Sequence, residues 1–258
     1  MKQIARCSIF ILFGLCLTAS RGTSAADNVP VLLELFTSEG CSDCPSADKL
    51  LAALDRSQPV AGADLIVLSE HVDYWNSGGW ADPWSSSANT ARQQEYVRRF
   101  GLRSAYTPQL VVDGQSELVG SDEAEARGAI AKAIRDRKLA ISISSPQHDN
   151  GQLNTHLEIP SSQNGYKGDA TVYVALADNQ DQSHVAGGEN RGRTLSHVAV
   201  VRAFGPVGTV VKGQQFTKDV NIPLKPGVGA SGLRVVAFVQ DKATGRVIGV
   251  AEQRVDKL

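Results

Sequence analysis

Cysteine is scarce in this chain of 258 residues, which has only four, at positions 7, 16, 41 and 44. So small a number excludes a disulfide-rich scaffold, in which several bridges take the place of a hydrophobic core. Cys7 and Cys16 fall in the N-terminal leader described below and would leave with it. An exported form of the chain would therefore keep Cys41 and Cys44 as its only thiol pair.

The chain also lacks a strong net charge and a hydrophobic run long enough to span a bilayer. Basic and acidic residues number 26 and 27, which argues against nucleic acid or anionic lipid as a partner. The apolar run from Ile9 to Leu17 is well short of the ~20 residues of a transmembrane helix. We therefore expect no nucleic-acid partner and no permanent membrane anchor.

The N-terminus has the three parts of a secretory signal peptide. Lys2 and Arg6 precede the apolar run, and small residues follow it. We predict a signal peptide over residues 1–26, cleaved near Ala25 or Ala26, and hence a periplasmic or secreted bacterial protein. Cleavage removes three basic residues, which leaves 23 of the 26 against 27 acidic residues, a formal net charge of about −4.

Residues 27–138 alternate short apolar runs with amphipathic segments. Strands are predicted over 31–36, 63–69, 109–112 and 116–120, and helices over 46–54, 88–100 and 121–138. This order, βαβαββα, is that of an α/β unit whose first two strands are parallel. An insertion over 74–87 holds all three tryptophans, and loops of this length are often functional.

The helix over 88–100 has the clearest pattern of inward and outward residues. Ser87 is expected to cap its N-terminus, and Gly101 to end it. Tyr96 is expected to face the sheet and Arg92 to face solvent.

From Leu139 onward the pattern changes to seven short alternating segments separated by turn residues. This spacing predicts a β-sandwich of antiparallel strands over 139–258. We find no internal repeat and no flexible linker before it. A charged stretch at 187–197, which includes Glu189, Arg191 and Arg193, is either a solvated loop or a contact in which the arginines face carboxylates of the first domain.

The two cysteines lie in Thr37-Ser38-Glu39-Gly40-Cys41-Ser42-Asp43-Cys44-Pro45, between a buried strand and a helix. Strand, dithiol turn and helix in this order are typical of a thioredoxin-like redox site. Cys41 is predicted at the helix N-terminus, which favours its thiolate, with Cys44 one turn inside. Cys41 would then attack a substrate and Cys44 would resolve the mixed disulfide. No cofactor is needed beyond this redox-active disulfide.

A purely structural disulfide is the weaker interpretation, because a bridge that closes two intervening residues constrains little chain entropy. Asp43 disfavours a neighbouring thiolate, so we expect a neutral or mildly reducing exchanger.

Other predicted site residues lie outside the dithiol turn. Thr107-Pro108 opens the third strand, and Pro108 is expected to be cis and to face the dithiol, where backbone groups can pair with an extended substrate. Glu34, seven residues before Cys41, could accept the proton of Cys44, face solvent or pair with a lysine.

The segment that follows the second strand is predicted to lie beside the cysteines, because parallel strands end at the same edge of a sheet. Asp73, Tyr74 and Trp75, together with Thr107, are expected to bind substrate, whereas Trp80 and Trp84 are expected to pack the loop. His71 is either a structural histidine or a site residue. With Cys41 and Cys44 it would form a set that suits copper(I), which thiolates select.

Four separated motifs resemble one family. They are Glu34-Leu35-Phe36-Thr37-Ser38-Glu39-Gly40-Cys41-Ser42-Asp43-Cys44-Pro45, His71-Val72-Asp73-Tyr74-Trp75, Tyr106-Thr107-Pro108-Gln109 and Gly188-Glu189-Asn190-Arg191-Gly192-Arg193. Together they are similar to an uncharacterised family of exported bacterial proteins, domain of unknown function 1223, in the thioredoxin-like superfamily. The resemblance covers essentially the whole mature chain. It implies a thioredoxin fold with Cys41 and Cys44 as the redox pair and Pro108 as the cis proline, and it implies no established substrate.

The leading functional hypothesis is a periplasmic thiol–disulfide oxidoreductase. Its partners would be exported protein thiols or a small thiol, and a membrane or periplasmic electron donor. Two alternatives stay open: a copper(I) chaperone that uses Cys41, Cys44 and His71, and a binding module whose disulfide is inert.

Overall fold

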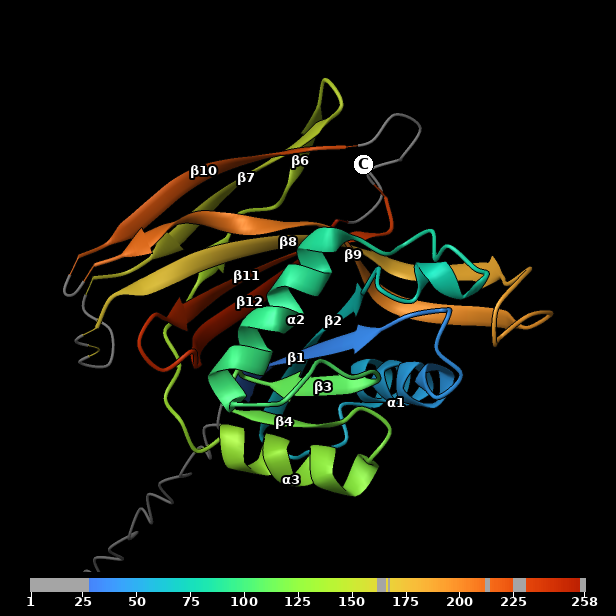
Figure 1. Cartoon of the computed structure of the whole chain (residues 1–258). Helices are drawn as coiled ribbons and strands as arrows, with labels where there is room; N and C mark the ends of the chain where they lie inside the picture. Colours follow the sequence, from blue (N-terminus) through green and yellow to red (C-terminus); the bar gives the residue numbers. More distant parts are fainter. Residues whose placement is uncertain (1–27, 162–165, 167, 212–213, 225–230, 256–258) are drawn as a thin grey trace, which may run out of the picture.

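The computed structural model describes residues 28–161, 166, 168–211, 214–224 and 231–255 (Figure 1). The predicted signal peptide, residues 1–26, lies outside these described residues. Within them, no helix is long and apolar enough to cross a membrane.

The first half of the described chain contains the predicted order of elements. These are β1 (Val29–Thr37), α1 (Cys44–Ser57), β2 (Ala63–His71), a 3-10 turn η1 (Asn76–Gly78), α2 (Ser87–Phe100), β3 (Gln109–Val112), β4 (Ser116–Val119) and α3 (Glu123–Ala133). β1 pairs parallel to β2 and antiparallel to β3, which pairs antiparallel to β4. The sheet order in this half is therefore β2-β1-β3-β4.

Local sequence explains the ends of these elements, with small differences from the predictions. Ser86, and not Ser87, caps α2, since its hydroxyl accepts a hydrogen bond from the Asn89 backbone N–H. Asp113 and Gly114 both have positive φ, 51° and 62°, as a tight hairpin turn between β3 and β4 requires. α3 ends at Ala133 and is shorter than predicted.

The second half of the described chain consists of strands. They are β5 (Ser142–Ile143), β6 (Gln147–Asp149), β7 (Gln152–Ile159), β8 (Ala170–His184), β9 (Thr194–Val210), β10 (Phe216–Pro223), β11 (Leu233–Asp241) and β12 (Val247–Val255). β10, β7 and β5 form an antiparallel sheet in that order, and β6 pairs with β7. The other strands join the first half in a mixed eight-stranded sheet of order β12-β11-β8-β9-β2-β1-β3-β4.

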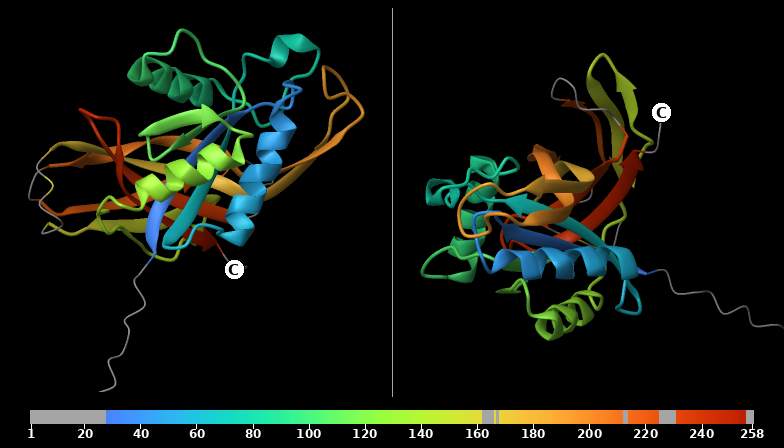
Figure 2. Two further views of the ribbon diagram at one scale, coloured as in Figure 1. Left: turned by 90° about the horizontal axis from the view of Figure 1, so that it is seen from below. Right: turned by 90° about the vertical axis from the view of Figure 1, so that its right-hand side faces the viewer.

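Two strands are much longer than the short segments predicted from alternation. β8 and β9 have 15 and 17 residues. Their inner parts belong to the strand-rich half, and β9 also lies beside β2, with Ser69 opposite Val200. Their outer parts form a hairpin at the end of the molecule where α1 begins (Figures 1 and 2).

The core follows from the two-residue period of the strands. Leu33 and Leu35 of β1 pack with apolar residues of α1 and α3 on one face of the mixed sheet, and Phe36 packs with Tyr96 of α2 on the other. Figure 2 shows α1 and α3 together on one side of the sheet. Since both faces are covered, β1 is apolar almost throughout.

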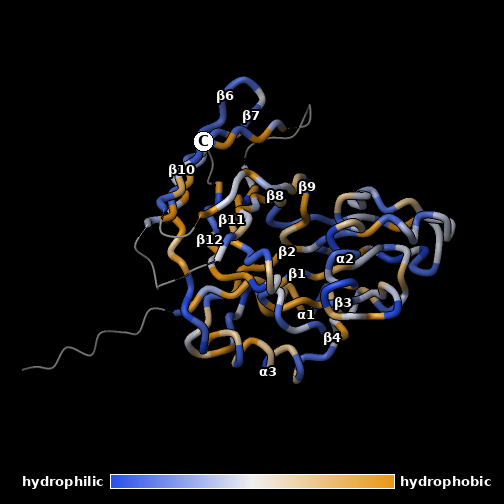
Figure 3. The backbone as a smooth tube through the Cα atoms, turned by 60° about the vertical axis from the view of Figure 1, so that its left-hand side comes forward, coloured by the Kyte–Doolittle hydropathy of each residue, from blue (hydrophilic) through white to orange (hydrophobic). Residues whose placement is uncertain are grey.

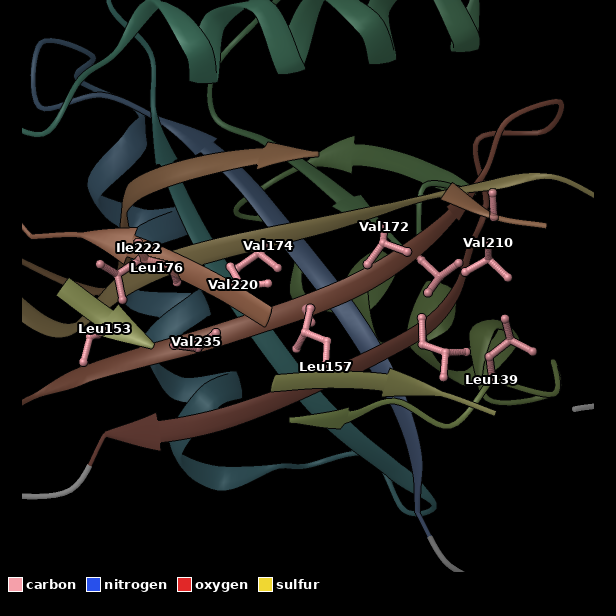
Figure 4. Packing of buried hydrophobic residues seen from close by; sticks show 14 of the residues in the cluster. Leu139, Leu153, Leu157, Val172, Val174, Leu176, Val210, Val220, Ile222 and Val235 are labelled. Atoms are coloured by element: carbon pink, nitrogen blue, oxygen red, sulfur yellow. The ribbon is translucent and has the colours of Figure 1, made fainter. Parts of the chain in front are cut away.

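A separate cluster fills the space between the two sheets. Its buried side chains, seen in Figure 4, come mainly from β7 and β10 on one side and from β8 and β11 on the other. Figure 3 shows the same distribution along the backbone, with apolar central strands and a hydrophilic β6–β7 hairpin. The strand-rich half therefore has the two apolar layers of a sandwich, one of which is part of the mixed sheet.

Candidate functional site

Cys41 and Cys44 form a disulfide with a Cα–Cα distance of 5.4 Å. α1 begins at Cys44, so Cys41 lies in the turn before the helix, and Cys44 is at the helix start instead of one turn inside as predicted. Both residues are buried: 2% of Cys41 and 0% of Cys44 is exposed to solvent. A thiol cannot attack a sulfur that it cannot reach, so the segments that cover the disulfide are part of the site.

The tip of the β8–β9 hairpin covers the dithiol turn. The Asn190 side-chain amide donates hydrogen bonds to the carbonyl oxygens of Glu39 and Cys41, over 2.9 and 2.8 Å. The Ser42 backbone N–H donates to the Glu189 carboxylate over 2.9 Å. Of the two alternatives for the charged stretch, the contact with the first domain is therefore present, but Glu189 and Asn190 make it and not the arginines. Arg193 instead donates to the Asn190 side-chain oxygen over 2.6 Å.

Two glycines, Gly187 and Gly188, allow the hairpin tip to approach the loop that follows β2. A Cβ atom added to Gly187 would lie 2.2 Å from the carbonyl oxygen of Gly79, and one added to Gly188 would lie 3.2 Å from Cβ of Trp80. Only a residue without a side chain fits at position 187. The hairpin tip, the loop after β2 and the dithiol turn thus meet at one end of the molecule (Figure 1).

Trp75 and Thr107 lie together beside the dithiol turn. The Trp75 indole N–H donates to the Thr107 hydroxyl over 2.8 Å, and a Cβ added to Gly40 would lie 3.0 Å from Cβ of Trp75. Tyr74 is exposed over 39% of its surface. Burial raises its pKa, and hydrogen bonds with Gln93 and Thr107 offset this in part. Tyr74, Trp75 and Thr107 therefore form one surface next to the disulfide.

The Thr107–Pro108 peptide bond is cis, as predicted. A Cβ added to Gly120 would lie 3.1 Å from Cβ of Ala47 and 3.2 Å from Cβ of Pro108. Pro108 is therefore close to the first turn of α1, which starts at the disulfide.

Asp73, which directly precedes Tyr74, makes its hydrogen bonds to α2. Its carboxylate accepts a hydrogen bond from the Thr90 hydroxyl over 2.6 Å, and its backbone N–H donates to the same hydroxyl over 3.1 Å. These two bonds attach the end of β2 to α2, and the contact of Asp73 with substrate stays a prediction.

Glu34 and Arg92 form a buried ion pair that the sequence did not indicate. The Arg92 guanidinium donates to the two carboxylate oxygens of Glu34 over 2.9 and 3.2 Å, and the Tyr96 hydroxyl donates to the same carboxylate. The prediction that Arg92 faces solvent is wrong, because its guanidinium is enclosed by the carboxylate and by four aromatic rings whose centroids lie within 5.4 Å. These rings are those of Tyr96, Tyr173, Phe204 and Phe238.

The pairing of Glu34 also bears on its predicted role as proton acceptor. Leu33 and Leu35 point toward α1, so Glu34 between them points to the opposite face of the sheet. The structure thus brings Glu34 to Arg92 and not to Cys44, which starts α1. The alternative that Glu34 pairs with a lysine is not met either, because its partner is an arginine.

Asp48 is a buried carboxylate on the same helix as Cys44. It lies four residues after Cys44 in α1, a spacing that places both side chains on one face of the helix. Its side chain is buried, and it accepts a hydrogen bond from the Thr37 hydroxyl over 2.9 Å. The four-residue spacing between cysteine and aspartate is visible in the sequence and could have identified it.

His197 connects Asp48 to a second carboxylate. Its Nε2 lies 3.2 Å from Glu39 and its Nδ1 lies 3.6 Å from Asp48. Trp80 also donates its indole N–H to Glu39 over 2.8 Å, and so takes part in the site instead of only packing the loop.

His71 packs edge-on against His197, with ring centroids 4.6 Å apart. Its Nδ1 lies 2.7 Å from Asp82, which also accepts the backbone N–H of Glu39 over 2.8 Å. The strand β9, from the second half of the chain, therefore supplies a histidine to a cluster of acids and histidines next to the disulfide.

The ionisation of this cluster follows from burial and from its neighbours. Burial raises the pKa of Asp48 above its ordinary value, and the nearby His197 and His71 offset this only in part. Burial alone would lower the pKa of His71, but the Asp82 carboxylate raises it above the ordinary value. Burial likewise raises the pKa of Glu39, and hydrogen bonds from His197, Ser183 and Trp80 more than reverse this. Proton binding is thus more favourable at Asp48, and less favourable at Glu39, than at the same side chains in water.

Metal binding by this cluster has limited support. Across the described part of the chain, no group of three His, Cys, Asp or Glu side chains has an arrangement that could hold a metal ion. The predicted copper(I) set uses reduced cysteines, whereas the two sulfurs are bonded to each other here. One feature fits a ligand role: His71 Nδ1 is engaged by Asp82, while its buried Nε2 has no hydrogen-bond partner.

The comparison with known sequences gives the family. A model described as a protein of unknown function, DUF1223, matches residues 32–240. The chain belongs to the DUF1223 family. None of the curated proteins matches it.

Solved structures similar to this DUF1223 protein share its fold. A crystal structure of an Agrobacterium tumefaciens protein is 26% identical with a TM-score of 0.70, over 91% of this chain and 98% of the other. HBP35 of Porphyromonas gingivalis is 14% identical with a TM-score of 0.63, over 90% of this chain and 76% of the other. Both matches include the mixed α/β half and the strand-rich half.

Proposed function

We propose that this DUF1223 protein is an exported thiol–disulfide oxidoreductase whose first half is a thioredoxin-like unit. The observation that carries the proposal is a disulfide between Cys41 and Cys44 at the start of α1, with the Thr107–Pro108 turn close to the same end of that helix. The sheet order β2-β1-β3-β4, with α1 and α3 on one face and α2 on the other, supports the thioredoxin-like assignment. The leader at residues 1–26 supports export to the periplasm or beyond the cell.

The reaction begins with the reduced pair and a disulfide substrate. The Cys41 thiolate attacks one substrate sulfur, which forms a mixed disulfide and releases the other substrate sulfur as a thiolate. Cys44 gives its proton to Asp48 and attacks Sγ of Cys41, so that the S–S bond of the oxidised pair forms and the second substrate thiolate leaves. A dithiol donor in the membrane or the periplasm returns two electrons by the reverse steps.

The cover over the disulfide shapes the choice of substrate. Because Cys41 is 2% exposed, a substrate has to displace the Asn190 side chain from the carbonyl oxygens of the dithiol turn. The surface of Tyr74, Trp75 and Thr107 lies beside the opening, where an extended peptide around a cysteine can pack on the aromatic rings. An exported protein with accessible cysteines is therefore the favoured substrate class, ahead of a small thiol.

Substitution of the two cysteines tests this function. Cys41→Ser is expected to abolish reduction of insulin disulfides, whereas Cys44→Ser is expected to trap a mixed disulfide with substrate, since the resolving thiol is missing. Ser57→Ala, at the exposed C-terminal end of α1, is the matched control and should keep activity. Unchanged activity of Cys41→Ser would contradict the proposal. A wild-type disulfide that survives millimolar dithiothreitol in the native state would favour a binding module with an inert bridge.

Copper(I) binding is the second candidate, and the buried, unpartnered Nε2 of His71 favours it. Bathocuproine competition with the reduced protein would measure the affinity for copper(I). His71→Ala is expected to weaken binding at least tenfold if His71 is a ligand, and equal affinities of the variant and the wild type would remove His71 from the site.

A further inference from the structure

A cleft of about 820 Å³ lies where the C-terminal half of α1 faces the outer part of the β8–β9 hairpin. Its walls come from both halves of the chain, α1 from the first and β8, β9 and β12 from the second. Ligand sites are often clefts of ~300–1,000 Å³ at boundaries of this kind. Most of the side chains that line this cleft are polar, so a ligand that fits it has to be polar too.

The wall formed by α1 and β12 has more positive than negative charges. The buried Arg234 donates hydrogen bonds to the carboxylates of Asp55 and Glu252, each over 3.0 Å. Arg254 lies 3.7 and 2.8 Å from the same two carboxylates. Two acids thus balance two arginines, and Arg56 is the third arginine of this wall. Arg56 is exposed in the last turn of α1 and has no ion pair within the described part of the chain.

The hairpin wall offers amide and hydroxyl groups. Gln180 and Gln182 of β8 and Ser196 of β9 line it and are exposed. The Gln182 amide donates to the Ser196 hydroxyl over 3.1 Å, so the Gln182 carbonyl oxygen can accept and the Ser196 O–H can donate. Burial and the neighbouring Asp178 raise the pKa of Asp181, the acid of this wall, to about 7. Asp181 therefore carries only part of a negative charge at neutral pH.

We propose that this cleft binds a short peptide, with a carboxylate of the peptide on Arg56 and its backbone amides on the hairpin wall. A guanidinium binds a carboxylate through two parallel N–H···O bonds. Glutamine and serine side chains each donate and accept, as the N–H and C=O groups of a peptide require. A tripeptide is about 10 Å long when extended. The peptide is bound here and not chemically changed, so this site does not depend on the proposed exchange reaction.

Isothermal titration calorimetry with trialanine and with trialanine amide tests the site, because the two peptides differ only in the terminal carboxylate. The wild type should bind trialanine about tenfold more tightly than the amide, since hydrogen bonds to charged groups are the stronger ones. Arg56→Gln should bind both peptides equally, with about tenfold lower affinity for trialanine. Arg98→Gln removes an exposed arginine from the last turn of α2, outside the cleft. It is the matched control and should bind both peptides as the wild type does.

A second variant tests the opposite wall. Gln182→Ala should weaken binding of both peptides to a similar degree and keep the preference for the carboxylate. Absence of trialanine binding at millimolar concentration, equal affinities of the wild type for the two peptides, or unchanged affinity in Arg56→Gln would overturn the proposal. Inorganic phosphate is the last probe. Phosphate binding as tight as that of trialanine would overturn the peptide assignment, because an anion alone would then account for the affinity.

Discussion

Asn190→Ala is expected to accelerate reduction of the Cys41–Cys44 disulfide by about 30-fold. The Asn190 amide donates two hydrogen bonds to the dithiol turn, to the carbonyl oxygens of Glu39 and Cys41. An intramolecular hydrogen bond contributes about 1 kcal/mol net. Loss of two therefore favours the open hairpin by about 2 kcal/mol, which corresponds to about 30-fold in its population. If reductants reach Cys41 only when the hairpin is open, the rate rises by the same factor.

The assay measures pseudo-first-order reduction by dithiothreitol at fixed pH in the wild type and the variant. Asn221→Ala, at an exposed position of β10 far along the chain from the site, is the matched control and should leave the rate unchanged. Circular dichroism establishes that both variants are folded. A rate for Asn190→Ala equal to or below that of the wild type would refute the reasoning, because the cover would then not limit access to the disulfide.

Three further predictions concern stability and the cover. Arg92→Leu leaves Glu34 buried without its cation and should lower the free energy of unfolding in urea by about 3–5 kcal/mol. The Glu34→Leu, Arg92→Leu double variant should lose less. A loss below about 1 kcal/mol in Arg92→Leu would contradict this prediction. Burial and the neighbouring Asp178 raise the pKa of Asp181 from 3.8 to about 7. The folded state thus binds this proton more tightly than the unfolded state, and the contribution to stability is lost as pH rises from about 4 to about 7. The Tm of Asp181→Asn should fall less than that of the wild type over this range. Equal changes of Tm with pH in the two proteins would contradict the raised pKa of Asp181. Gly187→Ala places a Cβ 2.2 Å from a carbonyl oxygen, so it should displace the hairpin tip and speed disulfide reduction; a wild-type rate would show that the tip accommodates it.

Local pattern in the sequence was enough to predict the elements of the first half. The buried run before Cys41 became β1, and the amphipathic run after Cys44 became α1. The cis bond at Pro108 also followed from its place at the start of the third strand. These features depend on residues within a few positions of each other, so that periodicity and turn residues carry the information.

The sequence by itself therefore determined the dithiol pair, its position between strand and helix, and the family of the chain. Tertiary structure alone decided what surrounds the pair. Asn190 lies 149 residues from Cys41 in the chain, and His197 lies 158 residues from Glu39. Arg92 is buried against Glu34, 58 residues away, whose carboxylate neutralises its charge. Local periodicity in the sequence does not indicate such contacts, because they form only when strands far apart in the chain pair in one sheet and bring polar side chains together.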